Sequence, residues 1–129
     1  MWLFTRYGFY SIACARSADG ALDPQTVMVR ARCRSQLQAL QKRFPALATA
    51  EILELPHSDY RFRIVIPKET WNLAVTALVE EQDWSNFKNE VASFQGSAGS
   101  EYVHALHDVW TVMYELQEKP RRNQNRSSR

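Results

Sequence analysis

The chain has 129 residues, of which 45% are hydrophobic and 23% are charged, so it suits one folded domain and is not disordered throughout. Its net charge is +2, but the charge is unevenly distributed along the chain. The net charge is +4 over residues 1–63, −7 over residues 64–118 and +5 over residues 119–129. It has no apolar run as long as a membrane-spanning helix, and two cysteines, Cys14 and Cys33, are too few for a disulfide framework. We therefore expect a cytoplasmic protein that binds no membrane.

The first two predicted elements are strands. Residues 2–15 are rich in aromatic and β-branched side chains, which predicts a long or bent strand in which Gly8 marks a bulge or a close backbone approach. Residues 16–25 are predicted to form a loop. In the strand that follows, Arg30 and Arg32 alternate with apolar residues and share a face. The two strands are expected to pair as a hairpin.

A helix and a second pair of strands follow. The helix ends at Pro45, and its apolar stripe consists of Cys33, Leu37, Leu40 and Phe44. Strands are predicted at residues 51–55 and 60–66, with a turn between them. In the second strand, alternation places Tyr60, Phe62, Ile64 and Ile66 on one face and Arg61, Arg63 and Val65 on the other.

Three helices are predicted after Pro67, a residue that favours the first position of a helix. The first helix turns Trp71, Ala74, Val75 and Leu78 inward. The second is short and is capped by Asp83 or Ser85. The last covers residues 101–117, with an inward face of Val103, Leu106, Trp110 and Met113.

This order of elements predicts an α+β fold. A single domain over residues 1–117 would contain two hairpins in an antiparallel sheet with helices on one face, in a ferredoxin-like or related two-layer sandwich. Residues 118–129 carry five of the chain's basic residues and nothing apolar to pack, so a disordered basic tail is expected there.

Four arginines of the predicted sheet form the first candidate site. Arg30 and Arg32 share a face of one strand, and Arg61 and Arg63 share a face of another. If the opposite faces cover the core, all four stand on the open side of the sheet. Basic and aromatic side chains on an open sheet are typical of domains that bind single-stranded RNA or DNA.

Other residues could complete or neutralise that face. Tyr7 or Tyr10 is expected nearby as the aromatic component. The tail arginines, Arg121 and Arg122, would add attraction to phosphates that does not depend on base sequence. The alternative is an ordinary polar outer face, in which the arginines pair with glutamates of neighbouring strands, Glu51 and Glu54.

A polar face on the last predicted helix is the second candidate site. His104, His107 and Asp108 lie three or four residues apart, which suits metal ligands or an acid–base pair, but a solvated helix face explains the same residues. Cys14 and Cys33 are expected to be buried or half-buried rather than nucleophilic. The chain also has no glycine-rich cofactor loop. We therefore assign no metal, cofactor or catalytic residue, and an enzyme is the less favoured class.

An acidic surface is the third candidate. It could dock a basic protein partner or the chain's own basic tail, and the alternative is a face that only keeps the protein soluble. Its residues are Glu80, Glu81, Asp83 and Glu90. The first three crowd the C-terminal end of a predicted helix, where the helix dipole disfavours negative charge, which indicates that this end meets something basic. A free sheet edge is a further surface, through which two copies of the chain could form a homodimer.

Two segments resemble a group of small uncharacterised bacterial proteins. One is the opening MW-x-FT-x-x-GF-x-S pattern of residues 1–11, and the other is the D-x-SNFK segment of residues 83–88. The resemblance implies a bacterial cytoplasmic source and no particular activity.

The sequence therefore favours a non-enzymatic binding or regulatory domain of a bacterium or mobile element, which binds nucleic acid through a basic sheet face and tail. One alternative is a protein-binding inhibitor or adaptor that acts through its acidic helices. Another is a small metal-dependent enzyme that uses His104, His107 and Asp108.

Overall fold

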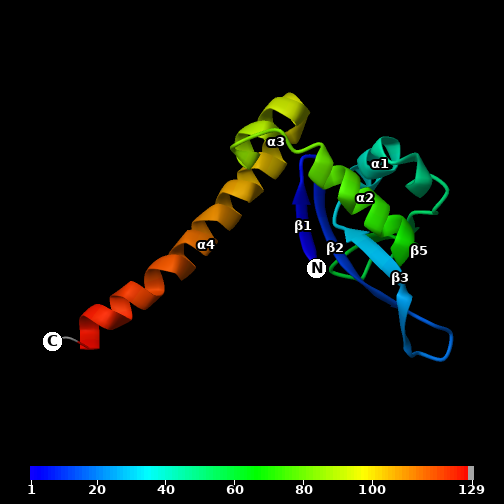
Figure 1. Ribbon diagram of the computed structural model, residues 1–129, viewed down its shortest axis with the longest axis horizontal. Helices are drawn as coiled ribbons and strands as arrows, with labels where there is room; N and C mark the ends of the chain where they lie inside the picture. Colours follow the sequence, from blue (N-terminus) through cyan, green and yellow to red (C-terminus); the bar gives the residue numbers. More distant parts are fainter. Residues whose placement is uncertain (128–129) are drawn as a thin grey trace. The chain divides into compact units, whose positions relative to one another are not determined.

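A computed structural model describes the backbone of residues 1–127 and the side chains of residues 1–119 (Figure 1). The chain divides into two compact units, Met1–Ser85 and Asn86–Arg129. The first unit contains, in chain order, β1 (Trp2–Thr5), β2 (Gly8–Arg16), β3 (Leu22–Ala31), α1 (Arg34–Arg43), the 3-10 helix η1 (Pro45–Leu47), β4 (Leu53–Glu54), β5 (Phe62–Pro67) and α2 (Lys68–Glu80). The second contains α3 (Phe87–Gln95), the 3-10 helix η2 (Gly96–Gly99) and α4 (Ser100–Ser127).

The first unit is built on a five-stranded antiparallel sheet, which confirms the predicted α+β class. The strand order is β1-β2-β3-β5-β4, so β1, β2 and β3 form a meander. Strand β5 pairs with both β3 and β4, and the connection from β3 to β4 passes through α1. This is one split β-α-β unit, whereas a ferredoxin-like domain has the order β-α-β-β-α-β.

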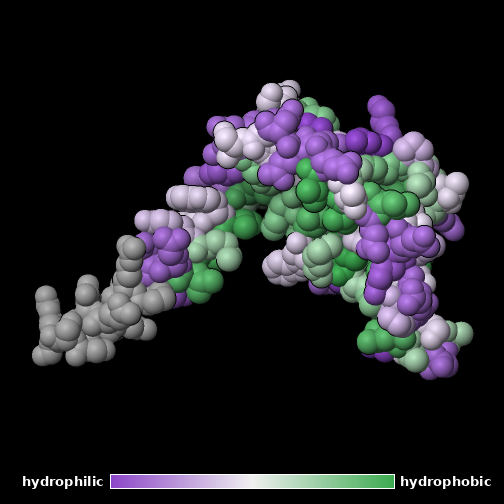
Figure 2. All heavy atoms as spheres, viewed as in Figure 1, coloured by the Kyte–Doolittle hydropathy of each residue, from purple (hydrophilic) through white to green (hydrophobic). Residues whose placement is uncertain are grey.

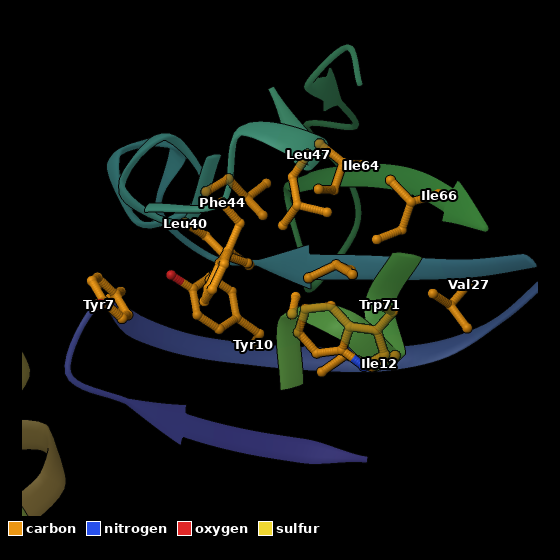
Figure 3. Close-up of a cluster of buried hydrophobic side chains, with 14 residues drawn as sticks. Tyr7, Tyr10, Ile12, Val27, Leu40, Phe44, Leu47, Ile64, Ile66 and Trp71 are labelled. Atoms are coloured by element: carbon orange, nitrogen blue, oxygen red, sulfur yellow. The ribbon is translucent and has the colours of Figure 1, made fainter. Parts of the chain in front are cut away.

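One face of the sheet is covered by α1 and α2 and carries the core, shown in Figure 3. Tyr10 of β2, Val29 of β3 and Ile64 of β5 are fully buried on this face. Helix α1 contributes the buried Leu37 and Leu40, and α2 contributes Trp71 and Ala74, as the spacing of apolar residues predicted. The prediction for Cys33 was wrong, because this residue precedes α1 and is exposed.

A tight turn divides the predicted strand over residues 2–15 into β1 and β2. The Thr5 Oγ1 accepts hydrogen bonds from the backbone N–H groups of Tyr7 and Gly8, both at 3.1 Å, and donates to the Gly8 carbonyl at 2.9 Å. Gly8 is a point of close approach, as expected: a Cβ atom there would lie 2.6 Å from the side chain of Gln36 in α1. The β-bulge lies elsewhere in β2, between Cys14 and Ala15.

The second unit consists of helices. Asn86 caps α3, since its side chain accepts a hydrogen bond from the Asn89 backbone N–H at 3.0 Å; the predicted caps, Asp83 and Ser85, lie before this position. Val91 of α3 and Leu106 of α4 are buried. Leu106 was predicted to face inward together with Trp110 and Met113. The prediction was wrong for these two residues, which are 53% and 58% exposed.

Helix α4 continues past the predicted end at residue 117 to Ser127. The side chains of Arg121 and Arg122 lie outside the described residues, so the predicted role of the tail stays a prediction. Within the part of the chain that is described, no helix combines the length and the apolar character needed to cross a bilayer.

Candidate functional site

The face of the sheet opposite the core gathers aromatic and basic side chains in register. Across the sheet, Trp2 of β1 lies opposite Ser11 of β2, and Arg30 of β3 links this row to Arg63 of β5. Within the first unit α1 and α2 both pack on the other face. We call this side of the sheet the open face, and its residues are Trp2, Phe4, Phe9, Ser11, Met28, Arg30, Arg63 and Val65, with Arg32 just after β3 and Tyr60 just before β5.

Two guanidinium groups of the open face are held against one aromatic ring. The guanidinium carbons of Arg30 and Arg32 lie 4.7 and 4.3 Å from the centre of the Tyr60 ring, and that of Arg32 also lies 5.6 Å from the centre of the Phe9 ring. Tyr60 itself is 5% exposed. Cation–π contacts of this kind fix the position of a guanidinium without neutralising its charge.

Neutral atoms accept the hydrogen bonds of Arg30 and Arg63. Arg30 donates from Nη2 to the Ser11 Oγ at 2.8 Å. Arg63 donates from Nη2 to the Ser58 Oγ at 3.1 Å and to the Tyr60 carbonyl at 3.3 Å. Among the side chains of residues 1–119, no carboxylate forms an ion pair with Arg30, Arg32 or Arg63. The open face therefore carries three positive charges, none of them in an ion pair with a described carboxylate.

The pKa of Arg63 reflects a positive charge that no carboxylate pairs with directly. Burial lowers the pKa of the Arg63 guanidinium, and the positive charge of Arg30 lowers it further, against a weaker opposite effect of Asp59. Its Nε is buried and has no hydrogen-bond acceptor in the described part of the chain. Because an arginine stays protonated at physiological pH, the result is a partly desolvated cation beside a second cation. A bound anion would relieve both penalties.

Arg61 does not join this group. Its Nε donates to the Glu54 carboxylate at 2.9 Å, and Arg34 approaches the other oxygen of the same carboxylate at 3.3 Å. The alternative for all four arginines was pairing with glutamates of neighbouring strands. Arg61 pairs in this way with Glu54, whereas Arg30, Arg32 and Arg63 lie together.

The aromatic residues of the open face differ from those predicted. Tyr7 and Tyr10 are both buried on the core side. Tyr60, predicted to share a face with Phe62, instead lies beneath Arg30 and Arg32, because it precedes β5 and does not follow the alternation of that strand.

The aromatic platform that sequence reasoning missed lies on β1 and β2. The rings of Phe4 and Phe9 stack with their centres 4.6 Å apart, and Trp2 meets Phe9 edge-on at 5.9 Å. Trp2 is 69% exposed. A turn placed between Thr5 and Gly8 would have found this set, because it puts Phe4 opposite Phe9.

One of the two histidines of α4, His107, takes part in aromatic stacking. The His107 ring stacks on Trp110 with centres 6.0 Å apart, and Trp110 stacks on Tyr114 at 5.3 Å. The Nζ of Lys88 lies 3.2 Å from the His107 Nδ1. His104 and Asp108 are exposed, and no three His, Cys, Asp or Glu side chains among the described residues come together as a metal site.

The acidic end of α2 is occupied from within the first unit. The Glu81 carboxylate pairs with Arg43 at 2.9 Å and with Arg6 at 3.5 Å, and it accepts a hydrogen bond from the Tyr7 hydroxyl at 2.8 Å. The pKa of Tyr7 is raised, first by burial and then by this hydrogen bond to Glu81. Of the predicted acidic surface, Glu81 is therefore engaged in an internal cluster, while Glu80 and Asp83 are exposed.

The open face thus combines three cations that form no ion pair with a described carboxylate and an aromatic cluster in which Trp2 is exposed and Phe4 and Phe9 are half-buried. In comparisons with protein-family models, with curated proteins and with solved structures, the chain matches none of them.

Proposed function

We propose that the protein is a non-enzymatic bacterial domain of the cytoplasm that binds single-stranded nucleic acid through the open face. One observation carries the proposal: Arg30, Arg32 and Arg63 lie together, without a described carboxylate partner, on the same face as an aromatic cluster whose Trp2 ring is exposed. Phosphates supply the missing negative charge, and bases stack on aromatic side chains.

The register of the sheet suits a nucleic acid that crosses the strands. Trp2 and Arg30 lie in one row with β2 between their strands, so they are about 10 Å apart at the usual strand spacing. A base on Trp2 would leave the backbone to run toward Arg30 and Arg63. Because stacking and phosphate contacts accept any base, we expect weak sequence preference. The tail arginines, Arg121 and Arg122, would add to the attraction.

The first test measures binding and its dependence on salt. Labelled single-stranded RNA and DNA are titrated with the full chain at two salt concentrations, and binding is followed by fluorescence anisotropy. Three phosphate contacts on a single strand predict a slope of about −2 in a plot of log affinity against log salt. Absence of binding to both polymers at low salt contradicts the proposal.

A matched pair of arginine variants locates the site. Arg63→Ala and Arg61→Ala remove the same charge from residues two positions apart, but Arg63 belongs to the open face and Arg61 is neutralised by Glu54. We expect Arg63→Ala to weaken binding about tenfold, which is within the range for a specific contact, and Arg61→Ala to change it less than about threefold. Equal losses would mean that only overall charge matters, and the open face would be the wrong site.

A further inference from the structure

Two arginines come together at three places in the first unit. At two of these places both guanidinium groups lie 3.5 Å or less from one shared carboxylate, and they are Arg6 and Arg43 at Glu81, and Arg34 and Arg61 at Glu54. At the third, Arg30 of β3 and Arg63 of β5 are directly opposite each other in the sheet, and neither forms an ion pair with a described carboxylate. The third pair therefore lacks an anion of the kind that each of the other two shares.

The positions of Arg30 and Arg63 make this lack costly. In antiparallel strands the Cβ atoms of opposite residues are about 4.5–5.5 Å apart, and like charges there destabilise the pair. Both side chains are half-buried, which weakens screening by solvent. The Asp59 carboxylate accepts the Tyr60 backbone N–H at 3.0 Å, and its effect on the pKa of Arg63 is weaker than that of Arg30. An anion bound by both guanidinium groups would remove the repulsion.

Both guanidinium groups keep N–H donors for such an anion. Of the five N–H groups that a guanidinium has, Arg30 directs those of Nε and Nη2 to Ser11, and its Nη1 has no described acceptor and is not fully buried. Arg63 directs Nη2 to the Ser58 hydroxyl and to a carbonyl, while its Nη1 faces the Met28 sulfur, a weak acceptor, at 3.5 Å. The Nη1 groups of the two arginines are therefore left for a ligand.

The charge of this pair selects among the phosphates of a nucleic acid. A phosphodiester inside a strand carries one negative charge. A terminal phosphomonoester carries a charge of about −1.5 to −2 at pH 7 and has three strong acceptor oxygens. Charge-assisted bonds between arginine and phosphate are strong and are often bidentate. A terminal phosphate therefore compensates two guanidinium groups, whereas an internal phosphate compensates one.

The described side chains of the second unit offer no comparable site. Between residues 86 and 119 the sequence has no arginine, and its lysines are Lys88 and Lys119. The Nζ of Lys88 lies over the Trp110 ring, 5.1 Å from its centre. Figure 2 shows hydrophobic atoms at the surface along α4, where Val112, Met113 and Leu116 are exposed. Such a surface has no donor for a phosphate.

We propose that Arg30 and Arg63 bind the terminal phosphate of a single strand, a phosphomonoester, and so hold the end of the strand on the open face. The inference rests on the proposed function. Arg32, which is exposed and forms no hydrogen bond with a described residue, is left for an internal phosphodiester, and Trp2 is left for a base. A phosphorylated protein side chain offers the same phosphate chemistry but has no base to stack on Trp2.

Strands that differ only in their ends test the inference on the wild type. Short oligothymidylates of equal length, with a 5′ phosphate, a 3′ phosphate or neither, compete with a labelled strand for the full chain. We expect a phosphate at one end to tighten binding about tenfold, because it adds charge-assisted hydrogen bonds. Equal affinities of all the strands would overturn the inference and leave the proposed function intact. Absence of binding by every strand would overturn both.

The pH dependence of this advantage identifies the dianion. The second pKa of a phosphomonoester is about 6, whereas arginine stays protonated. The advantage of the phosphorylated strand over the unphosphorylated one should therefore shrink as the pH falls from about 7.5 to about 5. Protonation of His57, next to Ser58, would act in the opposite direction, because it adds positive charge. An advantage that stays constant or grows as the pH falls would contradict the inference.

Two arginine variants assign the phosphate to its site. Arg63→Ala should remove most of the advantage of the phosphorylated strand. Arg32→Ala is the matched control within the open face, and it should weaken binding of both strands by the same factor and keep the advantage. Circular dichroism checks folding, and Arg30→Ala breaks the same pair if Arg63→Ala does not fold. An advantage that survives in the variants of the pair would place the phosphate elsewhere and overturn the inference.

A phosphopeptide separates the two sources of a phosphomonoester. The probe is a phosphoserine peptide without basic or aromatic residues, which offers the same phosphate but no base. It should compete about tenfold less well than the phosphorylated strand, because it lacks the stacking contact with Trp2. Equal competition by the peptide would overturn the assignment to the end of a nucleic acid.

Discussion

The two faces of the sheet come from the same strands but differ in nearly every property. Tyr10, Val29 and Ile64 are fully buried on the core side, and each is adjacent in the chain to a residue of the open face. Because side chains alternate along a strand, the register that buries the core also fixes the positions of Ser11, Arg30 and Arg63. The arginines therefore stand on strands whose other face is packed into the core, which suits a binding surface.

The arginines of the first unit show the same contrast. At the end of α2, Arg6 and Arg43 are paired with Glu81. On the open face, Arg30 and Arg63 are bonded to hydroxyl and carbonyl oxygens instead. Leaving cations without carboxylates costs stability, and such costs are typical of residues retained for function.

Two tryptophans offer the largest expected contrast between the faces. Trp71 packs over the core side and is 3% exposed, whereas Trp2 belongs to the open face and is 69% exposed. Replacing Trp71 by alanine should lower the free energy of unfolding by about 3–5 kcal/mol, because it leaves a large cavity. Trp2→Ala should lower it by less than about 1 kcal/mol. Urea unfolding of both variants measures the difference.

Trp2→Ala, the variant with the smaller expected effect on stability, should have the larger effect on nucleic-acid binding. Stacking of one base on an aromatic ring contributes about 1–3 kcal/mol, so Trp2→Ala should weaken binding of single-stranded RNA or DNA by about 5- to 150-fold. A Trp2→Ala protein that unfolds as readily as Trp71→Ala would show that this residue supports the fold. In that case the functional contrast between the faces would not hold.

Gly8 measures how closely the core side is packed. A Cβ atom at Gly8 would lie 2.6–2.7 Å from three carbons of Gln36, including its Cβ, so the side chain cannot simply swing away. We expect Gly8→Ala to lower the free energy of unfolding by about 2 kcal/mol. Gly20→Ala is the control, because Gly20 also has a positive φ but has no atom within 4 Å of the added carbon. Similar losses in the two variants would show that backbone strain, rather than contact with α1, decides the cost.

Much of the first unit could be predicted from the sequence. Alternation along β3 and β5 separated Val29 and Ile64 from Arg30 and Arg63, because within the first unit the helices cover one side of the sheet. The helix stripes of α1 and α2 were also correct at the buried Leu37, Leu40, Trp71 and Ala74, although Cys33 was wrongly included in the first. The turn between β1 and β2 was missed, since it is made by the Thr5 hydroxyl and has none of the usual turn residues before Gly8.

The candidate site was less accessible to sequence reasoning. Arg61 was grouped with Arg63 by alternation, but it lies before β5 begins and turns to Glu54. Tyr60 was assigned to the wrong face for the same reason. Helix α4 shows a different difficulty, because an amphipathic pattern predicts an apolar face and not what covers it. Trp110 and Met113 fit the predicted face and are nonetheless exposed.

The smallest expected effect concerns the paired charges at the end of α2. Tyr7→Phe removes the hydrogen bond to Glu81 and should lower the free energy of unfolding at neutral pH by about 1 kcal/mol. Because the pKa of Tyr7 is raised in the folded protein, the unfolded phenol ionises first as the pH rises. The contribution of Tyr7 is thus complete below about pH 10, the usual tyrosine value, and is lost as the pH rises toward its folded pKa.

The comparison of wild type and Tyr7→Phe isolates this residue from the other tyrosines, which titrate in both proteins. Urea unfolding at several pH values between neutral and alkaline should show a difference in stability that is constant up to about pH 10 and then shrinks. A difference that grows with pH would mean that the folded protein favours the ionised phenol. Glu81 would then not be its acceptor, and the contrast between paired charges at the end of α2 and unpaired charges on the open face would weaken.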